Sequence, residues 1–313
     1  MKKYLIILTM LFFAACSKTS NDTGTTPPPP PPPPATPVVS FTYTVNADQY
    51  PVTVSFSNTS TGYTSFNWDL GTSTSTATSP SGLYNTSDLK YTIKLVASNG
   101  TKTDSTKTDI TIPPLNRSVR MFYIIPTDKV YVQANYDAIV NNANTIRQWY
   151  SNQLGKTFKL NNPVVKVVYA TITSANFINT PGPTGSDPNS YFLYNSLAEL
   201  KNAGIRNPAN DDNYIYNVFT PVANPLGWGV WTIGGLRAAG IPDFGLGELT
   251  SGNTGNFNLG MGLWCHELGH SFGLNHPNPP DPTTIMTPSA NNYPGANFQS
   301  VEKTTVLADG FMF

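Results

Sequence analysis

The stretch that decides the fold of this chain is His266-Glu267-Leu268-Gly269-His270-Ser271-Phe272-Gly273-Leu274-Asn275-His276. The chain has three histidines in 313 residues, and all three lie in this stretch. His266 and His270 are four residues apart, so both imidazoles project from the same face of a helix. With Glu267 beside the first histidine, this spacing is typical of two zinc ligands and a general base for a metal-bound water.

Gly273 predicts the end of that helix. It follows His270 by three residues, and glycine readily takes the positive φ that lets a chain turn back after a helix. The turn would bring His276 to the same metal as a third ligand. Three protein nitrogens leave one position open for water, which is typical of a catalytic rather than a structural zinc site. We therefore expect one catalytic zinc ion.

Together these residues spell H-E-x-x-H-x-x-G-x-x-H, and the chain resembles the metzincin clan of zinc endopeptidases. The resemblance implies that His266, His270 and His276 are the metal ligands. It also implies that Glu267 polarises the water and passes its proton to the leaving amine.

A methionine turn beneath the metal is a further feature of this family. Ile285-Met286-Thr287-Pro288 begins nine residues after His276 and resembles that turn, with Met286 as the floor residue. Pro288 stands where some metzincins carry a tyrosine ligand, so no such ligand is expected. Pro277, directly after the third histidine, does not assign the chain to a subfamily.

Two other interpretations of the histidine stretch stay open. The histidines could satisfy hydrogen bonds inside a buried helix without any metal. Alternatively, the fold could bind zinc and lack activity, although the presence of Glu267 argues against this.

The first residues predict export. A basic Met1-Lys2-Lys3 precedes an apolar run over 4–15 that is too short to span a bilayer, so residues 1–15 are expected to be a signal peptide. Phe13-Ala14-Ala15-Cys16 resembles a bacterial lipobox, which implies a lipoprotein anchored to a membrane through Cys16. Ser17 then favours the outer membrane or the cell surface. The alternative is an ordinary signal peptide with an incidental cysteine.

Residues 16–37 are predicted to be a linker. Pro27 to Pro34 are eight consecutive prolines, which adopt a semi-rigid polyproline II helix of roughly 3 Å per residue. We expect a stalk that separates the anchor from the folded domains, rather than a ligand for a proline-binding module.

The composition excludes some functions. Lysine plus arginine equals aspartate plus glutamate at 18 each, and only 12% of residues are charged, so nucleic acid is not an expected partner. Cys16 and Cys265 are the two cysteines. With Cys16 lipidated, no disulfide can form within the chain. On a helix Cys265 points about 100° away from His266, so it is predicted to be a packed thiol rather than a ligand.

Residues 38–113 predict a β-sandwich. Val39, Phe41, Tyr43 and Val45 alternate with polar residues, and similar runs follow between turn residues. Phe66-Asn67-Trp68-Asp69-Leu70-Gly71 and the run 91–100 resemble a PKD domain, an immunoglobulin-like sandwich. Trp68 would be a core anchor. The resemblance implies a spacer or a weak binding module for glycan or protein, although the loop after Trp68 departs from the family motif.

Residues 118–313 are predicted to form an α+β domain. Strands are expected at 120–125, 164–171 and 214–219. An amphipathic helix is expected at 136–154, ending at Gly155, and a short helix around 193–200. The histidine helix is expected from about Asn258, and a last short helix at 299–307. This order resembles a metzincin domain with a twisted mixed sheet, a backing helix, an active-site helix and a small C-terminal subdomain.

Two further sites are predicted around the sheet. Gly229, Val230 and Trp231, within a strand at 229–233, are expected to form the antiparallel edge strand that pairs with extended substrate in the metzincin family. The alternative is an ordinary strand with its tryptophans in the core. Asp211-Asp212 could bind calcium, although a solvated turn is the simpler interpretation.

The expected function is a zinc metalloendopeptidase anchored to the cell envelope, with polypeptide as its substrate. The alternative is a surface adhesion or glycan-binding lipoprotein whose zinc-peptidase fold is inactive. The motif by itself also permits zinc-dependent hydrolysis of a non-peptide substrate.

Overall fold

The computed structural model describes residues 36–231, 236–288 and 292–313, and residues 37–313 form one compact unit. The predicted signal peptide, Cys16 and the proline run of the predicted linker lie outside the described residues. Within the described ranges, no helix is both long enough and apolar enough to cross a membrane.

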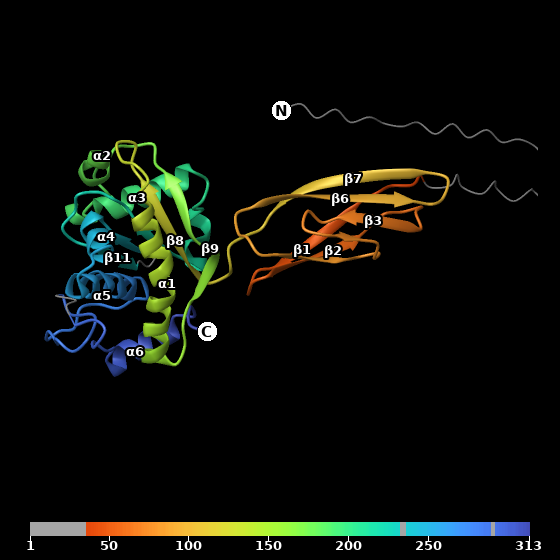
Figure 1. The fold of residues 1–313 in the computed structure, drawn as a ribbon. Helices are drawn as coiled ribbons and strands as arrows, with labels where there is room; N and C mark the ends of the chain where they lie inside the picture. Colours follow the sequence, from red (N-terminus) through yellow and green to blue (C-terminus); the bar gives the residue numbers. More distant parts are fainter. Residues whose placement is uncertain (1–35, 232–235, 289–291) are drawn as a thin grey trace, which may run out of the picture. The chain divides into compact units, whose positions relative to one another are not determined.

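The first domain is all-β, as predicted. Among the described residues, one sheet has the order β1-β2-β5 and a second has the order β4-β3-β6-β7, and neighbouring strands in each are antiparallel (Figure 1). The strands are β1 (Phe41–Asn46), β2 (Val52–Asn58), β3 (Ser65–Asp69), β4 (Thr74–Ser75), β5 (Ser81–Tyr84), β6 (Lys90–Ser98) and β7 (Thr103–Thr111). One apolar cluster draws buried residues from both sheets, so the sheets enclose a shared core.

Trp68 anchors this core. Its side chain is fully buried, and its ring lies against the rings of Phe41 and Phe56, with centroid distances of 5.2 and 5.8 Å. The indole N–H donates to the carbonyl of Ala77 at 3.0 Å, so the one polar atom of the side chain is satisfied. The prediction that Trp68 is a core residue is confirmed.

The second domain is built on a mixed sheet. Among the described residues its five strands have the order β11-β12-β10-β8-β9. They are β8 (Ser118–Ile125), β9 (Lys159–Tyr169), β10 (Tyr214–Phe219), β11 (Trp228–Trp231) and β12 (Arg237–Ile241). The pairs of β9 with β8, β8 with β10 and β10 with β12 are parallel, whereas β11 is antiparallel to β12 and lies at the edge.

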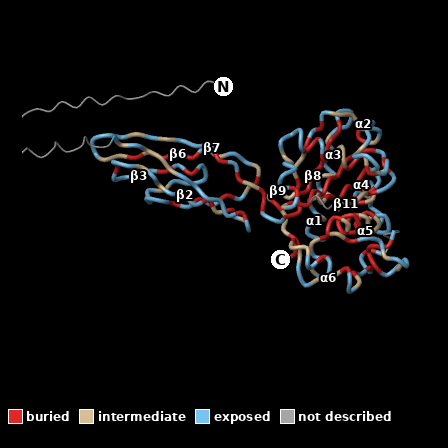
Figure 2. Tube along the Cα trace, turned by 180° about the vertical axis from the view of Figure 1, so that it is seen from behind, coloured by how far each residue is buried: buried red, intermediate tan, exposed pale blue. Residues whose placement is uncertain are grey.

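Helices cover both faces of this sheet. They are α1 (Gln133–Leu154), α2 (Ser174–Asn179), α3 (Tyr191–Asn202), α4 (Asp243–Leu249), α5 (Thr254–Ser271) and α6 (Ser300–Ala308), with short 3₁₀ turns at Pro188–Ser190 and Pro208–Asn213. Strand β8 divides the two cores, because Met121 and Tyr123 face the cluster with α1, α4 and α5, whereas Phe122 and Ile124 face the cluster with α3. Figure 2 shows buried residues concentrated along β8 and α5.

Several element boundaries differ from the sequence prediction. The histidine helix α5 begins at Thr254 rather than near Asn258, because the Asn253 side chain accepts hydrogen bonds from the N–H groups of Gly255 and Asn256 and caps an extra turn. The first turn, Thr254-Gly255-Asn256-Phe257, has one apolar residue and so shows no helical periodicity. Strand β9 begins at Lys159, five residues earlier than predicted. Elements α2, α4 and β12 were not predicted, since each is short.

Buried polar contacts hold α5 against the sheet and against α1. Asn217 on β10 accepts a hydrogen bond from the indole N–H of Trp264 at 2.5 Å and donates to the carbonyl of Ala239 at 3.2 Å. On the other side, the hydroxyl of Tyr150 on α1 donates to the carbonyl of Cys265 at 3.0 Å. Cys265 itself is fully buried among apolar residues, as predicted for a packed thiol.

Asn217→Ala should destabilise the protein by about 2–4 kcal/mol. The substitution leaves the Trp264 N–H and the Ala239 carbonyl buried without their partner, and each such loss costs about 1–3 kcal/mol. Denaturant unfolding would measure this change. Asn141→Ala, at an exposed position of α1, is the matched control and should stay within about 0.5 kcal/mol of wild type. Equal stability of the two variants would contradict the proposed role of Asn217.

Candidate metal centre

Helix α5 carries His266 and His270 on one face, one turn apart. The His266 side chain is buried, and its Nδ1 lies 2.8 Å from the carbonyl oxygen of Ile285. The Nδ1 of His270 lies 2.7 Å from the carbonyl oxygen of Leu274. A carbonyl can only accept a hydrogen bond, so each Nδ1 carries the proton and each Nε2 presents a lone pair.

The end of α5 turns the chain back toward these two rings. Gly273 has φ +89°, its N–H donates to the carbonyl of His270, and the N–H of Leu274 donates to the carbonyl of Gly269. This is the Schellman arrangement that ends many helices, and it favours glycine at the left-handed position. The turn places His276 beside the two helical histidines.

The Nε2 atoms of the three histidines converge. His266 lies 3.1 Å from His276 and 3.1 Å from His270, and His270 lies 3.2 Å from His276, each measured between Nε2 atoms. Two lone pairs facing each other repel unless a cation lies between them. Nitrogens that bind zinc tetrahedrally at about 2.0–2.1 Å are about 3.3–3.4 Å apart, close to these spacings. The donor set therefore fits a single cation, and His266, His270 and His276 are the described residues that could hold it.

Desolvation favours the neutral form of the imidazoles, most strongly for buried His266 and less for His276, whose side chain is exposed. Burial lowers the pKa of His266 to about 3, with the neighbouring His270 as a second cause. Burial also lowers the pKa of His270 and of His276. Only a neutral imidazole can bind a metal, so the fold holds the ligands in the state that binding requires.

Glu267 lies beside the ligands in a buried position. Its side chain is 6% exposed, and burial raises its pKa to about 8, while the backbone N–H of Gly229 favours the charged form. A carboxyl group with a pKa near neutrality can both accept and return a proton under physiological conditions.

Met286 lies under the helix that carries the ligands. It is fully buried, and a Cβ placed on Gly269 would collide with its sulfur, so the thioether packs directly against the α5 backbone. The turn is held by Thr284, whose hydroxyl donates to the Glu302 carboxylate at 2.7 Å. The same carboxylate oxygen accepts the N–H of Gln299 at 2.7 Å and caps α6.

Sequence reasoning did not identify Thr284 and Glu302. The spacing of Gln299 and Glu302 was a usable signal, since a side-chain acceptor followed three residues later by glutamate is a helix-capping pattern. The contact of Glu302 with Thr284 had no sequence signal, because the two residues are 18 positions apart.

The predicted edge strand runs along the metal helix. Gly229 and Val230 line a cavity of about 280 Å³ together with His270, Gly273, Leu274 and Asn275. Strand β11 is therefore an antiparallel edge strand beside the candidate metal centre. Residues 232 and 233 of the predicted strand lie outside the described residues.

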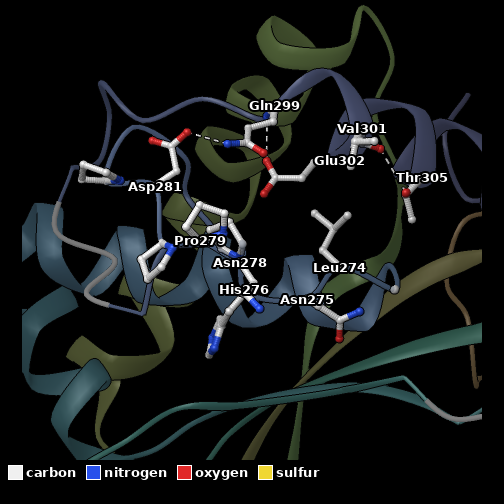
Figure 3. Close-up of a pocket in the computed structure, with 14 residues that line it drawn as sticks. Leu274, Asn275, His276, Asn278, Pro279, Asp281, Gln299, Val301, Glu302 and Thr305 are labelled. Carbon is white, nitrogen blue, oxygen red and sulfur yellow. Dashed lines mark hydrogen bonds between the residues drawn. The ribbon is translucent and has the colours of Figure 1, made fainter.

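A larger cavity of about 620 Å³ lies on the other side of the chain turn, between residues 273–282 and α6. Figure 3 shows Glu302, Gln299 and Asp281 along its upper rim, while the ring of His276 points away from them. This cavity shares the backbone of the third ligand, but its residues do not surround the point where the Nε2 atoms meet.

The interpretation of Asp211-Asp212 as a solvated turn is wrong for Asp211. Its side chain is buried and forms a bidentate ion pair with the guanidinium of Arg206. Both carboxylate oxygens are thereby committed to a protein cation, which argues against the calcium site considered from the sequence.

Gly269→Ala and Met286→Ala should be strongly coupled. An added methyl group at position 269 overpacks the contact with Met286, which costs about 1–3 kcal/mol, although alanine favours the helix by about 1 kcal/mol. Removing the methionine side chain makes room for that methyl group. A double-mutant cycle on the free energy of unfolding should give an interaction energy above about 0.5 kcal/mol. Additive effects would contradict the contact.

The metal-free protein should be most stable between about pH 4.5 and 6.5, where the opposite contributions of His266 and Glu267 to the free energy of unfolding cancel and the stability is nearly constant. The two contributions are as follows. Below pH 6.5 the unfolded state protonates His266 and the folded state does not, because burial lowers its folded pKa to about 3, so stability falls as the pH falls. Above pH 4.5 the unfolded state ionises Glu267 while the folded state keeps the proton up to a pKa of about 8, so stability falls as the pH rises.

Glu267→Gln tests the second half of this dependence. Measured by denaturant unfolding with a chelator present, the variant should be more stable than wild type at pH 8, by at most roughly 1.4 kcal/mol for each unit of pKa shift. At pH 5, where the carboxyl group is largely protonated in the folded state, the difference should be small. A variant no more stable than wild type at pH 8 would show that the carboxyl group is not held in its neutral form.

Comparisons with solved structures give matches to PKD domains over about a quarter of the chain. No protein-family model and no curated protein matches it. It is similar to the PKD1 domain of the Vibrio cholerae metalloprotease PrtV, with 26% identity and a TM-score of 0.22 over 25% of this chain and 99% of that one. The PKD1 domain of Vibrio anguillarum Epp matches with 23% identity and a TM-score of 0.22, over 26% and 96% of the two chains. These are weak, partial matches to PKD domains, and they carry no argument about the metal centre.

Proposed function

We propose that this protein is a zinc metalloendopeptidase of the metzincin type. The observation that carries the proposal is the convergence of the His266, His270 and His276 Nε2 atoms at 3.1–3.2 Å, with Glu267 beside them. Three neutral nitrogen ligands leave one coordination position for water, as in catalytic zinc sites. When bound, zinc would polarise a substrate carbonyl and lower the pKa of its water to about 7.

The chain's own residues supply the proton transfers. Glu267 takes the proton from the attacking water and returns it to the nitrogen of the leaving amine. The buried position of the carboxyl group supports this role. Burial raises its pKa to about 8 in the metal-free protein, and a zinc ion nearby would favour the ionised form that accepts the proton. Because Ile285 and Leu274 fix the Nδ1 protons of the helical histidines, those rings cannot turn to compete for the transferred proton.

Strand β11 is proposed to bind an extended polypeptide. It is antiparallel to β12 and has no partner strand on its other side among the described residues. The free main-chain groups of an edge strand can pair with a peptide, and Gly229, Val230 and Trp231 form this strand. The cavity bounded by Val230, His270 and Leu274 would take a substrate side chain near the metal.

We propose that the N-terminal segment and the β-sandwich determine where in the cell envelope the enzyme is located. The lipobox-like residues before Cys16 and the proline run support a lipoprotein tethered to the outer membrane or cell surface. The β-sandwich would act as a spacer, or as a weak contact for glycan or protein.

Glu267→Ala is the direct test. The full chain carrying this change should keep its fold and one zinc ion per chain but lose peptide hydrolysis by at least about 100-fold, since a positioned general base contributes about 10²–10⁴-fold. Turnover of a peptide library and metal analysis of the purified protein give the two readouts. His276→Ala is the comparison variant and should lose zinc as well as activity.

The same experiment separates the alternatives. Full hydrolysis by Glu267→Ala would contradict the mechanism. A wild-type chain that binds one zinc ion and cleaves neither unfolded proteins nor peptides would favour an adhesion or glycan-binding protein with an inactive zinc fold. Cleavage of ester substrates alone would indicate a non-peptide hydrolase.

A further inference from the structure

Two glycines, one just before the edge strand and one within it, pack directly on Glu267 and its helix. Gly227 is buried and directly precedes β11, and Gly229 is the second residue of that strand. A Cβ built on Gly227 would lie 2.7 Å from Cγ and 2.8 Å from Oε1 of Glu267. Real Cβ atoms essentially never approach so closely, so the Glu267 side chain occupies the volume that any residue other than glycine at position 227 would fill.

Gly229 meets a different part of the same helix. A Cβ at this position would collide with the backbone oxygen of Glu267 and lie 2.5 Å from the Cβ of His270. Neither atom can move without moving α5 itself. The absence of a side chain at position 229 therefore sets how closely β11 approaches the helix, whereas the absence of one at 227 leaves room for the carboxylate.

The loop before β11 is held in place independently of the metal centre. The side-chain amide of Asn224 donates to the carbonyl of Leu226 at 2.8 Å and to the carbonyl of Asn189 at 3.1 Å. Trp228 and Val230 pack against the apolar cluster on the opposite face of the sheet. These contacts hold the backbone of Gly227 in place. Of the two groups that meet here, the Glu267 side chain is the one that can move.

We propose that Gly227 is a positioning residue for Glu267. The volume that a side chain at position 227 would fill is the volume in which the Glu267 carboxylate lies beside the histidines. This inference rests on the proposed function. With alanine at 227, the carboxylate must leave that position, since the side chain of Glu267 is the part that can yield. The three histidines and β11 would keep their places, so zinc binding and substrate binding would persist while proton transfer becomes slower.

The test is a double-mutant cycle on the full chain with wild type, Gly227→Ala, Glu267→Ala and the double variant. In the zinc-loaded protein, Gly227→Ala should lower kcat at least about tenfold and change KM less than about twofold, with one zinc ion retained. In the Glu267→Ala background it should not lower the residual activity further, because no carboxylate remains to be displaced. Gly252→Ala, where a Cβ meets nothing within 4 Å, is the control and should behave as wild type.

Unfolding of the same proteins gives a readout that does not depend on activity. Gly227→Ala should lower the denaturant midpoint when residue 267 is glutamate, and this loss should disappear when residue 267 is alanine and the new methyl group has room. Gly229→Ala, which collides with backbone, should lower the midpoint in both backgrounds.

The outcomes are distinct. An unchanged kcat in Gly227→Ala, or an equal loss of midpoint with glutamate and with alanine at 267, would overturn the positioning role. A wild-type chain without hydrolytic activity would remove the proposed function, and with it the positioning role, while the unfolding cycle would still show whether Gly227 confines the Glu267 side chain.

Discussion

The constraint that governs the arrangement of the second domain is the convergence of three imidazole Nε2 atoms at one point. Each helical histidine donates its Nδ1 proton to a backbone carbonyl, so its Nε2 faces the other rings without a proton. The facing Nε2 lone pairs of His266 and His270 repel each other in the absence of a cation. Burial also disfavours protonation of these two rings, because it lowers the pKa of both. Packing contacts around α5 therefore have to offset the energetic cost of bringing the three side chains together.

Those packing contacts surround α5. Asn217 holds Trp264 on the sheet side, and Tyr150 holds the Cys265 carbonyl on the side of α1. Met286 supports the helix at Gly269, and its turn is tied to α6 through Thr284 and Glu302. Glycines allow these approaches: Gly269 leaves room for the methionine sulfur, Gly229 lets β11 lie close to α5, and Gly227 leaves room for the Glu267 side chain. Helix α5 is therefore held by contacts on several sides, and glycines lie where neighbouring groups approach it most closely.

Much of the fold followed from periodicity. Alternating apolar residues identified the sandwich with Trp68 in its core, and helical spacing identified α1 and its end at Gly155. Failures occurred where the local signal was weak or where a distant residue decided the outcome. The first turn of α5 has one apolar residue, Phe257, and was not predicted. Asp211 was predicted to lie in a solvated turn, because the sequence does not show that its carboxylate pairs with the guanidinium of Arg206 in the folded chain. The weak matches to PKD domains concern about a quarter of the chain and leave the metal centre to be judged by its geometry.

The sequence by itself determined the candidate ligand set, the glutamate beside it and the helix-ending glycine, because these residues are close in the chain and helical geometry relates them directly. Only the tertiary structure decided which groups surround them. The carbonyl of Ile285 that fixes the His266 ring is 19 positions away, and Gly227, which borders the Glu267 carboxylate, lies 40 positions before it in the loop that precedes β11. Such contacts depend on how strands and helices pack, and a glycine in the sequence does not reveal which side chain will fill the space it leaves empty.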